Sequence, residues 1–145
     1  MKFFVLGASG LVGGAFARAA QAAGHFVIGT VGSFTGAIAG VSEKRILDLT
    51  DASALEAAIQ HTQPDVLINA AAISEPGKCD EDPARSHQLN VALPALLARI
   101  AQARGTRLLH LSSEQVFAGD RAPYAVTDPV HPINTYAEQK VESEK

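Results

Sequence analysis

Hydrophobic residues along the chain gather in five short runs, separated by longer stretches with a different pattern. The runs are rich in Phe, Val, Ile and Leu and are too short for helices, which is typical of buried strands. They predict strands at residues 3–6, 25–30, 45–48, 66–69 and 107–111. The stretches between them predict helices at about 11–23, 52–61 and 83–103, and a last helix from Asn134. Segments 31–43, 70–82 and 117–133 are predicted as loops.

Residues that start and stop helices support these boundaries. Gly24 and Gly105 stand where the first and third helices end, and glycine is the usual residue after a helix. Asp51 and Asp82 stand at the N-cap positions of the second and third helices, and Pro83 suits the first helical position. A further proline, at position 94, predicts a kink or break in the third helix near residue 93.

The alternation of strands and helices predicts the fold class. Strands joined by helices form a parallel sheet with right-handed crossovers. We expect an α/β protein with a three-layer, doubly wound parallel sheet, a Rossmann fold, with the strand order 3-2-1-4-5. The whole of residues 1–145 is expected to form one NAD(P)-binding domain. In such sheets, ligands bind at the carboxyl ends of the strands.

A glycine-rich turn follows the first predicted strand. It spans Gly7 to Gly13 with the spacing G-x-x-G-x-x-G. Gly7 allows a sharp turn, Gly10 allows close approach of a pyrophosphate, and Gly13 allows tight packing of the helix. Amide groups at the helix N-terminus would bind the phosphates, so the cradle includes Ser9, Leu11 and Val12. The alternative is a glycine-rich turn without a ligand.

Composition narrows the class of protein. Hydrophobic residues make up 47% of the chain, and 12 Lys and Arg against 15 Asp and Glu give a formal net charge of −3. No basic run indicates nucleic acid, and no apolar run reaches the length of a membrane span. Cys79 is the only cysteine, which fits a reducing compartment, and we expect a cytoplasmic protein. A homodimer is compatible with the sequence.

The remaining titratable residues point away from metal or thiol chemistry. The five histidines have no metal-ligand spacing, and His110 is predicted to be a hydrogen-bonded core residue. Cys79 is predicted to lie in a polar loop beside Asp80, Glu81 and Asp82, whose charges would raise the pKa of its thiol.

Residues after the second, third and fourth strands bear on the choice of nucleotide. The second strand ends at Thr30 with no carboxylate to accept ribose hydroxyls or to repel a 2′-phosphate, so NADP is favoured and NAD stays open. Asp48 and Leu49 would lie beside the adenine, or Asp48 is a strand-end carboxylate. Small residues after the fourth strand would let the ribose approach the backbone, or they serve tight packing: Asn69, Ala70, Ala71 and Ala72.

Tyr136 and Lys140 form a Y-x-x-x-K pattern at the start of the last helix, which puts both on one face. A nearby ammonium lowers the pKa of a tyrosine and makes it a better acid–base group. Lys140 would also hold the nicotinamide ribose. Ser112 and Ser113, directly after the fifth strand, would fix a carbonyl oxygen beside the phenol. The alternative is that Tyr136 and Lys140 lie on a solvated helix face.

Several motifs together resemble one family, the extended short-chain dehydrogenases/reductases. These are Gly7–Gly13, Pro64–Ala72, Leu89-Asn90-Val91, Leu109–Gly119, and Tyr136 with Lys140. More narrowly, the chain resembles the dTDP-4-dehydrorhamnose reductase group, within the NAD-dependent epimerase/dehydratase superfamily. The resemblance implies NAD(P)-dependent reduction of a carbonyl on a nucleotide-sugar, in dTDP-rhamnose biosynthesis. It implies Ser113, Tyr136 and Lys140 as the catalytic residues. Asn90 would support the surroundings of Lys140, or it is a structural amide.

The chain also departs from this family. Glu114-Gln115 stands where Asp-Tyr is usual, and Ala137 stands where glycine is usual. Family members are about twice as long, so we expect the last strands and the substrate-binding lobe to be absent from residues 1–145. The fifth strand would then be an unpaired edge, and the isolated chain is expected to self-associate or to be unstable. Two other functions stay open: a non-catalytic nucleotide-binding regulatory subunit, and a nucleotide-sugar epimerase or dehydratase.

Overall fold

The computed structural model describes all residues 1–145, and the chain divides into two compact units. The sheet unit comprises residues 1–71 and 93–111, and the helical unit comprises residues 72–92 and 112–145. No helix has both the length and the apolar character needed to span a membrane.

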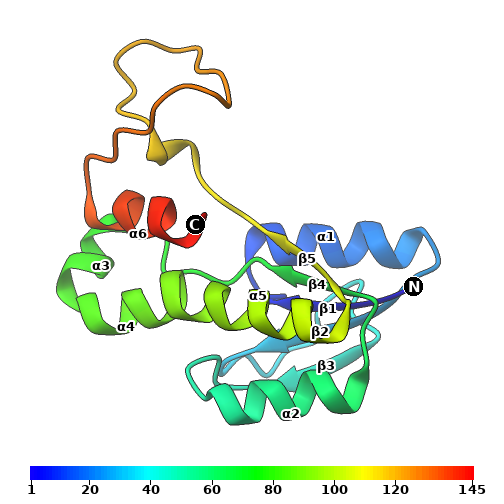
Figure 1. Cartoon of the computed structure of the whole chain (residues 1–145). Helices are drawn as coiled ribbons and strands as arrows, with labels where there is room; N and C mark the ends of the chain where they lie inside the picture. The colour runs from blue at the N-terminus through cyan, green and yellow to red at the C-terminus, as the bar shows by residue number, and fades with distance from the viewer. The chain divides into compact units, whose positions relative to one another are not determined.

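A five-stranded parallel sheet forms the centre of the sheet unit, in the predicted order β3-β2-β1-β4-β5. The strands are β1 (Lys2–Leu6), β2 (Phe26–Val31), β3 (Glu43–Ile46), β4 (Val66–Asn69) and β5 (Arg107–His110). The helices of this unit are α1 (Leu11–Ala22), α2 (Ala52–Thr62) and α5 (Leu93–Arg104). Figure 1 shows α1 on one face of the sheet and α2 and α5 on the other. This confirms the three-layer, doubly wound fold.

The two faces of the sheet carry separate hydrophobic cores because side chains alternate along each strand. On the α1 side, Val5 packs with Val27, Ile68 and Ala17. On the other face, alternation directs Phe4, Leu6, Ile28 and Leu67 toward the layer that contains the buried Leu55, Ile59 and Leu97. The predicted strand β1 is therefore buried on both faces, as its continuous apolar run indicated.

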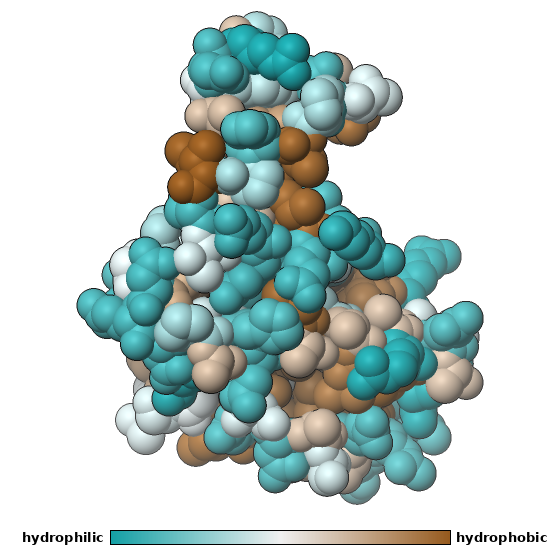
Figure 2. All heavy atoms as spheres, turned by 60° about the vertical axis from the view of Figure 1, so that its left-hand side comes forward, coloured by the Kyte–Doolittle hydropathy of each residue, from teal (hydrophilic) through white to brown (hydrophobic).

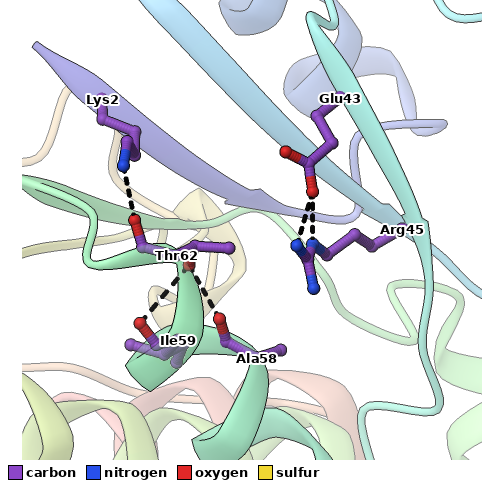
Figure 3. Close-up of polar contacts among 6 residues, drawn as sticks. All are labelled: Lys2, Glu43, Arg45, Ala58, Ile59 and Thr62. Carbon is purple, nitrogen blue, oxygen red and sulfur yellow. Dashed lines mark hydrogen bonds and ion pairs between the residues drawn. The ribbon is translucent and has the colours of Figure 1, made fainter.

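Polar contacts fix the end of α2 and the outer strand β3 (Figure 3). The Lys2 ammonium donates to the Thr62 carbonyl at 2.7 Å, and the Thr62 hydroxyl donates to the Ala58 carbonyl at 2.8 Å. The Arg45 guanidinium binds the Glu43 carboxylate through Nε at 2.7 Å and through a second nitrogen at 2.6 Å. One surface hollow is lined by residues of both contacts, namely Lys2, Glu43, Arg45 and Thr62.

The helical unit contains five short elements. They are α3 (Pro76–Glu81), α4 (Pro83–His87), the π-helical segment η1 (Gln88–Ala92), the 3-10 turn η2 (Glu114–Val116) and α6 (Thr135–Ser143). Of these, the start of α4 at Pro83 and the helix after Asn134 were predicted from the sequence. Between η2 and α6 runs a long loop, drawn in yellow and orange in Figure 1. Figure 2 shows that the outer part of this loop is mostly hydrophilic. Nearer α6, Val130 and Ile133 are exposed.

Most predicted boundaries are confirmed, and the errors have local causes. Asp51 caps α2 through its carboxylate, and Gly24 and Gly105 adopt φ of +80° and +64° after their helices. The third strand lies two residues earlier than predicted, because the register pairs Glu43 with Ile28 and brings Leu47 beyond the strand end. The break predicted near residue 93 is confirmed, because the π-helical segment η1 directly before Leu93 divides the helix predicted for 83–103 into α4, η1 and α5. The predicted loop 70–82 contains α3, which the pattern did not indicate.

Candidate functional site

The glycine turn of the sheet unit has the geometry that its spacing predicts. Gly7 follows β1 with a φ of +76°, a conformation that glycine adopts without strain. A Cβ added to Gly13 would lie 2.3 Å from the Gly7 carbonyl oxygen, so the helix approaches the turn too closely for any other residue. At Gly10 an added Cβ would lie 3.2 Å from the same oxygen. The turn and the start of α1 therefore form one tightly packed piece.

The N-terminus of α1 is left without a side-chain cap. Its N-cap residue is Gly10, which has no side chain to offer, whereas Asp51 caps α2 and Asn134 caps α6. Leu11 and Val12, in the first turn, are exposed. The first amides of a helix need an acceptor, and an anion satisfies them while gaining from the helix dipole. The turn can hold a pyrophosphate at this end of α1.

Thr30, which was predicted to end the second strand beside the nucleotide, faces the interior of the sheet unit. Its side chain is fully buried, and its hydroxyl donates to the Val5 carbonyl at 3.4 Å. The segment after the strand is instead held by Lys44, whose ammonium donates to the carbonyls of Thr35 at 2.6 Å and Gly36 at 3.0 Å. An ammonium has three protons, so one remains for a ligand. Residues 32–37 contain no carboxylate.

Asp48 and Leu49 follow β3, and Asp48 has a structural task. Its carboxylate accepts hydrogen bonds from the Thr50 amide at 2.9 Å and the Thr50 hydroxyl at 2.8 Å. This is a local turn of the kind that Asp favours at strand ends. Asp48 therefore acts as a strand-end carboxylate in this structure, which was the alternative to a position beside the adenine.

The residues after β4 pack against the glycine turn. A Cβ on Gly7 would lie 2.9 Å from the Ala70 carbonyl oxygen and 3.0 Å from the Ala71 Cα, so the two turns are in close contact. Asn69 is buried; its side-chain oxygen Oδ1 accepts from the Ala71 amide at 3.3 Å, and its side-chain nitrogen Nδ2 lies 3.2 Å from Nδ1 of His110. The half-buried His110 is hydrogen-bonded, as predicted. Ala70 and Ala71 therefore serve tight packing against the glycine turn.

In the helical unit, the predicted catalytic side chains come together. Asn134 caps α6 by accepting from the Ala137 amide at 2.8 Å, and α6 carries Tyr136 and Lys140 one turn apart. Both are buried, with 6% and 2% of their surface exposed, so the solvated helix face is excluded. The Ser113 side chain is close enough to the Tyr136 phenol to lower its pKa.

The electrostatics of Tyr136 differ from the expectation. Burial raises the pKa of Tyr136 above 10.0, the nearby Ser113 side chain opposes this, and the charges of Glu114 and Cys79 add to it. Burial also lowers the pKa of Lys140, and the carboxylate of Glu144 opposes that change. The prediction that an ammonium lowers the pKa of Tyr136 is therefore wrong here, because desolvation dominates. Tyr136 is a neutral phenol at pH 7, the form that donates a proton.

Two of the three residues that depart from the family pattern, Glu114 and Gln115, have defined side-chain contacts. Glu114 accepts from the Ser113 hydroxyl at 3.1 Å, so its carboxylate and Tyr136 both lie close to one hydroxyl. Gln115 accepts from the Asn134 amide at 3.2 Å and thereby holds the residue that caps α6. Glu114 and Gln115 thus help to set the position of the serine and of the helix.

Three other residues of the helical unit were predicted to belong to the site, and their observed surroundings differ from that prediction. Asn90 is buried in η1, where its side chain forms hydrogen bonds with the Ile73 backbone and with Gln139. None of these hydrogen bonds reaches Lys140. Its description as a structural amide fits these contacts. Ser112 donates to the carboxylate of Glu144. Ala72 is exposed and begins the helical unit.

Cys79 was predicted to lie in a polar loop, and this is wrong. It lies in α3, it is fully buried, and its thiol donates to the Ile73 carbonyl at 3.3 Å. The pKa of the thiol is raised, as predicted, but mainly by burial, with a smaller contribution from Asp80. The thiol is therefore a packing group and not a nucleophile. No group of three or more His, Cys, Asp or Glu is placed to hold a metal ion.

Sequence patterns missed Lys44, Ser86 and Gln139. The contact of Lys44 with the carbonyls of Thr35 and Gly36 depends on the register of β3, which the sequence alone does not give. Ser86 and Gln139 are polar residues in helices, and nothing in their spacing reveals that both are buried.

Comparison with known proteins places this arrangement in a family. The whole chain, residues 1–145, matches the RmlD substrate binding domain family. The chain belongs to that family. A crystal structure of a hypothetical dTDP-4-dehydrorhamnose reductase from Sulfolobus tokodaii has a TM-score of 0.88 and 30% identity, over 99% of this chain and 50% of that one. UDP-glucose 4-epimerase of Thermotoga maritima, at 19% identity and a TM-score of 0.85, shares the fold, over 99% of this chain and 49% of that one.

Among curated relatives of this RmlD family member, two kinds of protein have similar identity. The dTDP-4-dehydrorhamnose reductase of Mycolicibacterium smegmatis is 33% identical, over 99% of this chain and 40% of that protein. The methionine adenosyltransferase 2 subunit beta of Xenopus laevis is 32% identical, over 99% of this chain and 42% of that protein. The chain thus spans less than half the length of these curated relatives.

Proposed function

We propose that the protein is a cytoplasmic, NADP-dependent reductase of a keto group on a dTDP-sugar, of the dTDP-4-dehydrorhamnose type. One observation carries the proposal: Tyr136 and Lys140 are both buried one turn apart on α6, and Ser113 is close enough to the phenol to influence its pKa. A phenol and a hydroxyl that lie close together can both approach a carbonyl oxygen. The names of the relatives supply the substrate class.

Each side chain of this group has a separate task in the proposed reaction. The dinucleotide supplies the hydride for the carbonyl carbon. The electron pair of the C=O π bond moves to oxygen, and Tyr136 donates its proton to that oxygen. Ser113 orients the carbonyl oxygen by hydrogen bonding. Lys140 offers a positive charge one turn from the phenol, which stabilises the phenolate that proton transfer leaves.

The dinucleotide would be held by the sheet unit. The cradle is the uncapped start of α1 together with Gly7, Gly10 and Gly13, which lets a pyrophosphate approach the backbone. NADP is favoured over NAD, because residues 32–37 have no carboxylate and Lys44 retains one proton for a phosphate.

The first test is turnover. The purified protein should oxidise NADPH in the presence of dTDP-4-dehydrorhamnose, and consumption of the reduced nicotinamide is followed by its absorbance. A matched mixture with a dTDP-sugar that lacks the keto group is the control. NADPH consumption that does not depend on the keto sugar contradicts the proposal.

The second test is the choice of cofactor. NADPH should raise the melting temperature more than NADH at equal concentration, and a tenfold difference in affinity corresponds to about 1.4 kcal/mol. Lys44→Met should reduce the advantage of NADPH. Arg45→Met is the matched control, because that guanidinium is bound to Glu43. Equal shifts by the two cofactors in the unaltered protein would remove the preference for NADP.

A non-catalytic regulatory subunit is the second candidate, and the similarity to subunit beta of methionine adenosyltransferase 2 favours it. This candidate predicts binding of NADPH without turnover. It also predicts a stable complex with a methionine adenosyltransferase catalytic subunit in size-exclusion chromatography. The retained Ser113, Tyr136 and Lys140 support the enzyme instead.

A further inference from the structure

A chain of buried amides and hydroxyls runs through the helical unit beside the catalytic helix. Gln139 lies on α6 and is 6% exposed. Its carbonyl oxygen accepts from the Asn90 amide at 2.8 Å, and its own amide donates to the Ser86 hydroxyl at 2.9 Å. Both ends of the side chain are therefore bonded to buried groups, since Asn90 is 1% exposed and Ser86 is fully buried.

The two partners are themselves fixed to backbone. Asn90 accepts from the Ile73 amide and donates to the Ile73 carbonyl, both at 2.9 Å. Ser86 donates to the Pro83 carbonyl at 3.2 Å or the Cys79 carbonyl at 3.3 Å. Gln139 thus connects α6 to α4, to η1 and, through Asn90, to the segment before α3. An unpaired polar group in a buried site costs free energy. These hydrogen bonds therefore oppose any movement that would break them.

The position of Gln139 on the helix relates these bonds to Tyr136 and Lys140. An α-helix advances about 100° per residue, so Gln139 lies roughly 60° to one side of Tyr136, and Lys140 lies roughly 40° to the other. A rotation of α6 about its axis would break both bonds of Gln139 and would move Tyr136 and Lys140 together. The same two bonds oppose a shift of α6 along its axis.

We propose that Gln139 is a positioning residue, whose two hydrogen bonds to Asn90 and Ser86 set the rotation of α6 and thereby aim the Tyr136 hydroxyl. An amide meets both partners in the observed way, since it accepts at one end and donates at the other, whereas an ionised carboxylate could not donate to Ser86. The inference rests on the proposed function for its catalytic consequence, but the position of Tyr136 can be measured without any turnover.

The experiment uses fluorine NMR on protein labelled with 3-fluorotyrosine, which ionises at lower pH than tyrosine. The chain has two tyrosines, and a Tyr124→Phe variant assigns the resonances. Gln139→Met removes both hydrogen bonds while keeping a side chain of similar size, and Glu138→Met, at an exposed neighbour on the same helix, is the matched control.

Gln139→Met should shift the Tyr136 resonance and lower the midpoint of its titration toward that of an exposed tyrosine, because burial is the main cause of its raised pKa. Glu138→Met should change neither.

Kinetics give the second readout. Gln139→Met should lower kcat about tenfold to a hundredfold with the KM for NADPH unchanged, as expected for a misplaced proton donor. Ser86→Ala removes only one partner of Gln139, and it should displace the Tyr136 resonance in the same direction if Gln139→Met does not fold. If Gln139→Met and Ser86→Ala leave the resonance and titration as in Glu138→Met, the positioning role is overturned. If the resonance moves but the unaltered protein reduces no keto sugar, the positioning role stands and the proposed function fails.

Discussion

Tyr136→Phe is expected to abolish reduction while leaving NADPH binding intact. The substitution removes only the hydroxyl, and the ring stays buried between the same neighbours. Loss of a general acid lowers a rate by about a hundredfold to ten-thousandfold, so kcat should fall within that range. The affinity for NADPH should stay within about twofold, because the glycine turn is in the sheet unit, as are the residues after β2.

The control for this experiment is the other tyrosine. Tyr124 lies in the loop between η2 and α6, where its hydroxyl donates to Asp120 at 2.7 Å and its ring stacks on Phe117 at 4.5 Å. Tyr124→Phe removes the same atom from a different place, and kcat should be unchanged. Full turnover by Tyr136→Phe would refute its role as the acid.

The raised pKa of Tyr136 fits the direction of the proposed reaction. A proton donor must be protonated before the step, and burial keeps the phenol neutral throughout the physiological range. In the proposed reaction, Ser113 and the positive charge of Lys140 would stabilise the phenolate that proton transfer leaves. Glu114 opposes that charge, and its carboxylate also accepts from the Ser113 hydroxyl. A Glu in place of the usual Asp therefore bears on how readily this tyrosine gives up its proton.

Much of the sheet unit could be predicted because its information is local. The strand β4 was predicted at its observed bounds, Val66–Asn69, since Val66-Leu67-Ile68 is a continuous apolar run after Pro64-Asp65. The role of each glycine in the turn from Gly7 to Gly13 could be predicted separately, because the local backbone at each of these positions favours a residue without a Cβ. Strand β3 was predicted two residues too late, since three of its four residues are charged and its register depends on pairing with β2.

The helical unit was less predictable because long-range contacts define it. Cys79 has acidic neighbours in the sequence, yet it is buried because α3 packs against α6. Gln139 bonds a residue 49 positions away and another 53 positions away, which no local pattern reveals. The pKa of Tyr136 was predicted with the wrong sign because its burial depends on the same contacts. Motif spacing thus identified the catalytic candidates, but not what surrounds them.

Gly13→Ala is expected to damage both stability and cofactor binding. The new Cβ would lie 2.3 Å from the Gly7 carbonyl oxygen and 2.9 Å from the Gly7 carbonyl carbon, well inside van der Waals contact. Because both are backbone atoms, α1 or the turn must move. Overpacking of this kind costs about 1–3 kcal/mol, which corresponds to a fall in melting temperature of roughly 3–12 °C.

The neighbouring glycine provides a matched control. Gly14 is also buried in α1, but its added Cβ would lie 3.3 Å from the Ala8 carbonyl oxygen, which a small adjustment relieves. Gly14→Ala also gains about 0.5–1 kcal/mol of helix propensity, so its melting temperature should be close to that of the unaltered protein. NADPH titrations should show a loss of more than about tenfold in affinity for Gly13→Ala, a free-energy change of about 1.4 kcal/mol, and little change for Gly14→Ala. Equal affinities for the two variants would mean that the turn does not hold the dinucleotide, whatever its effect on stability.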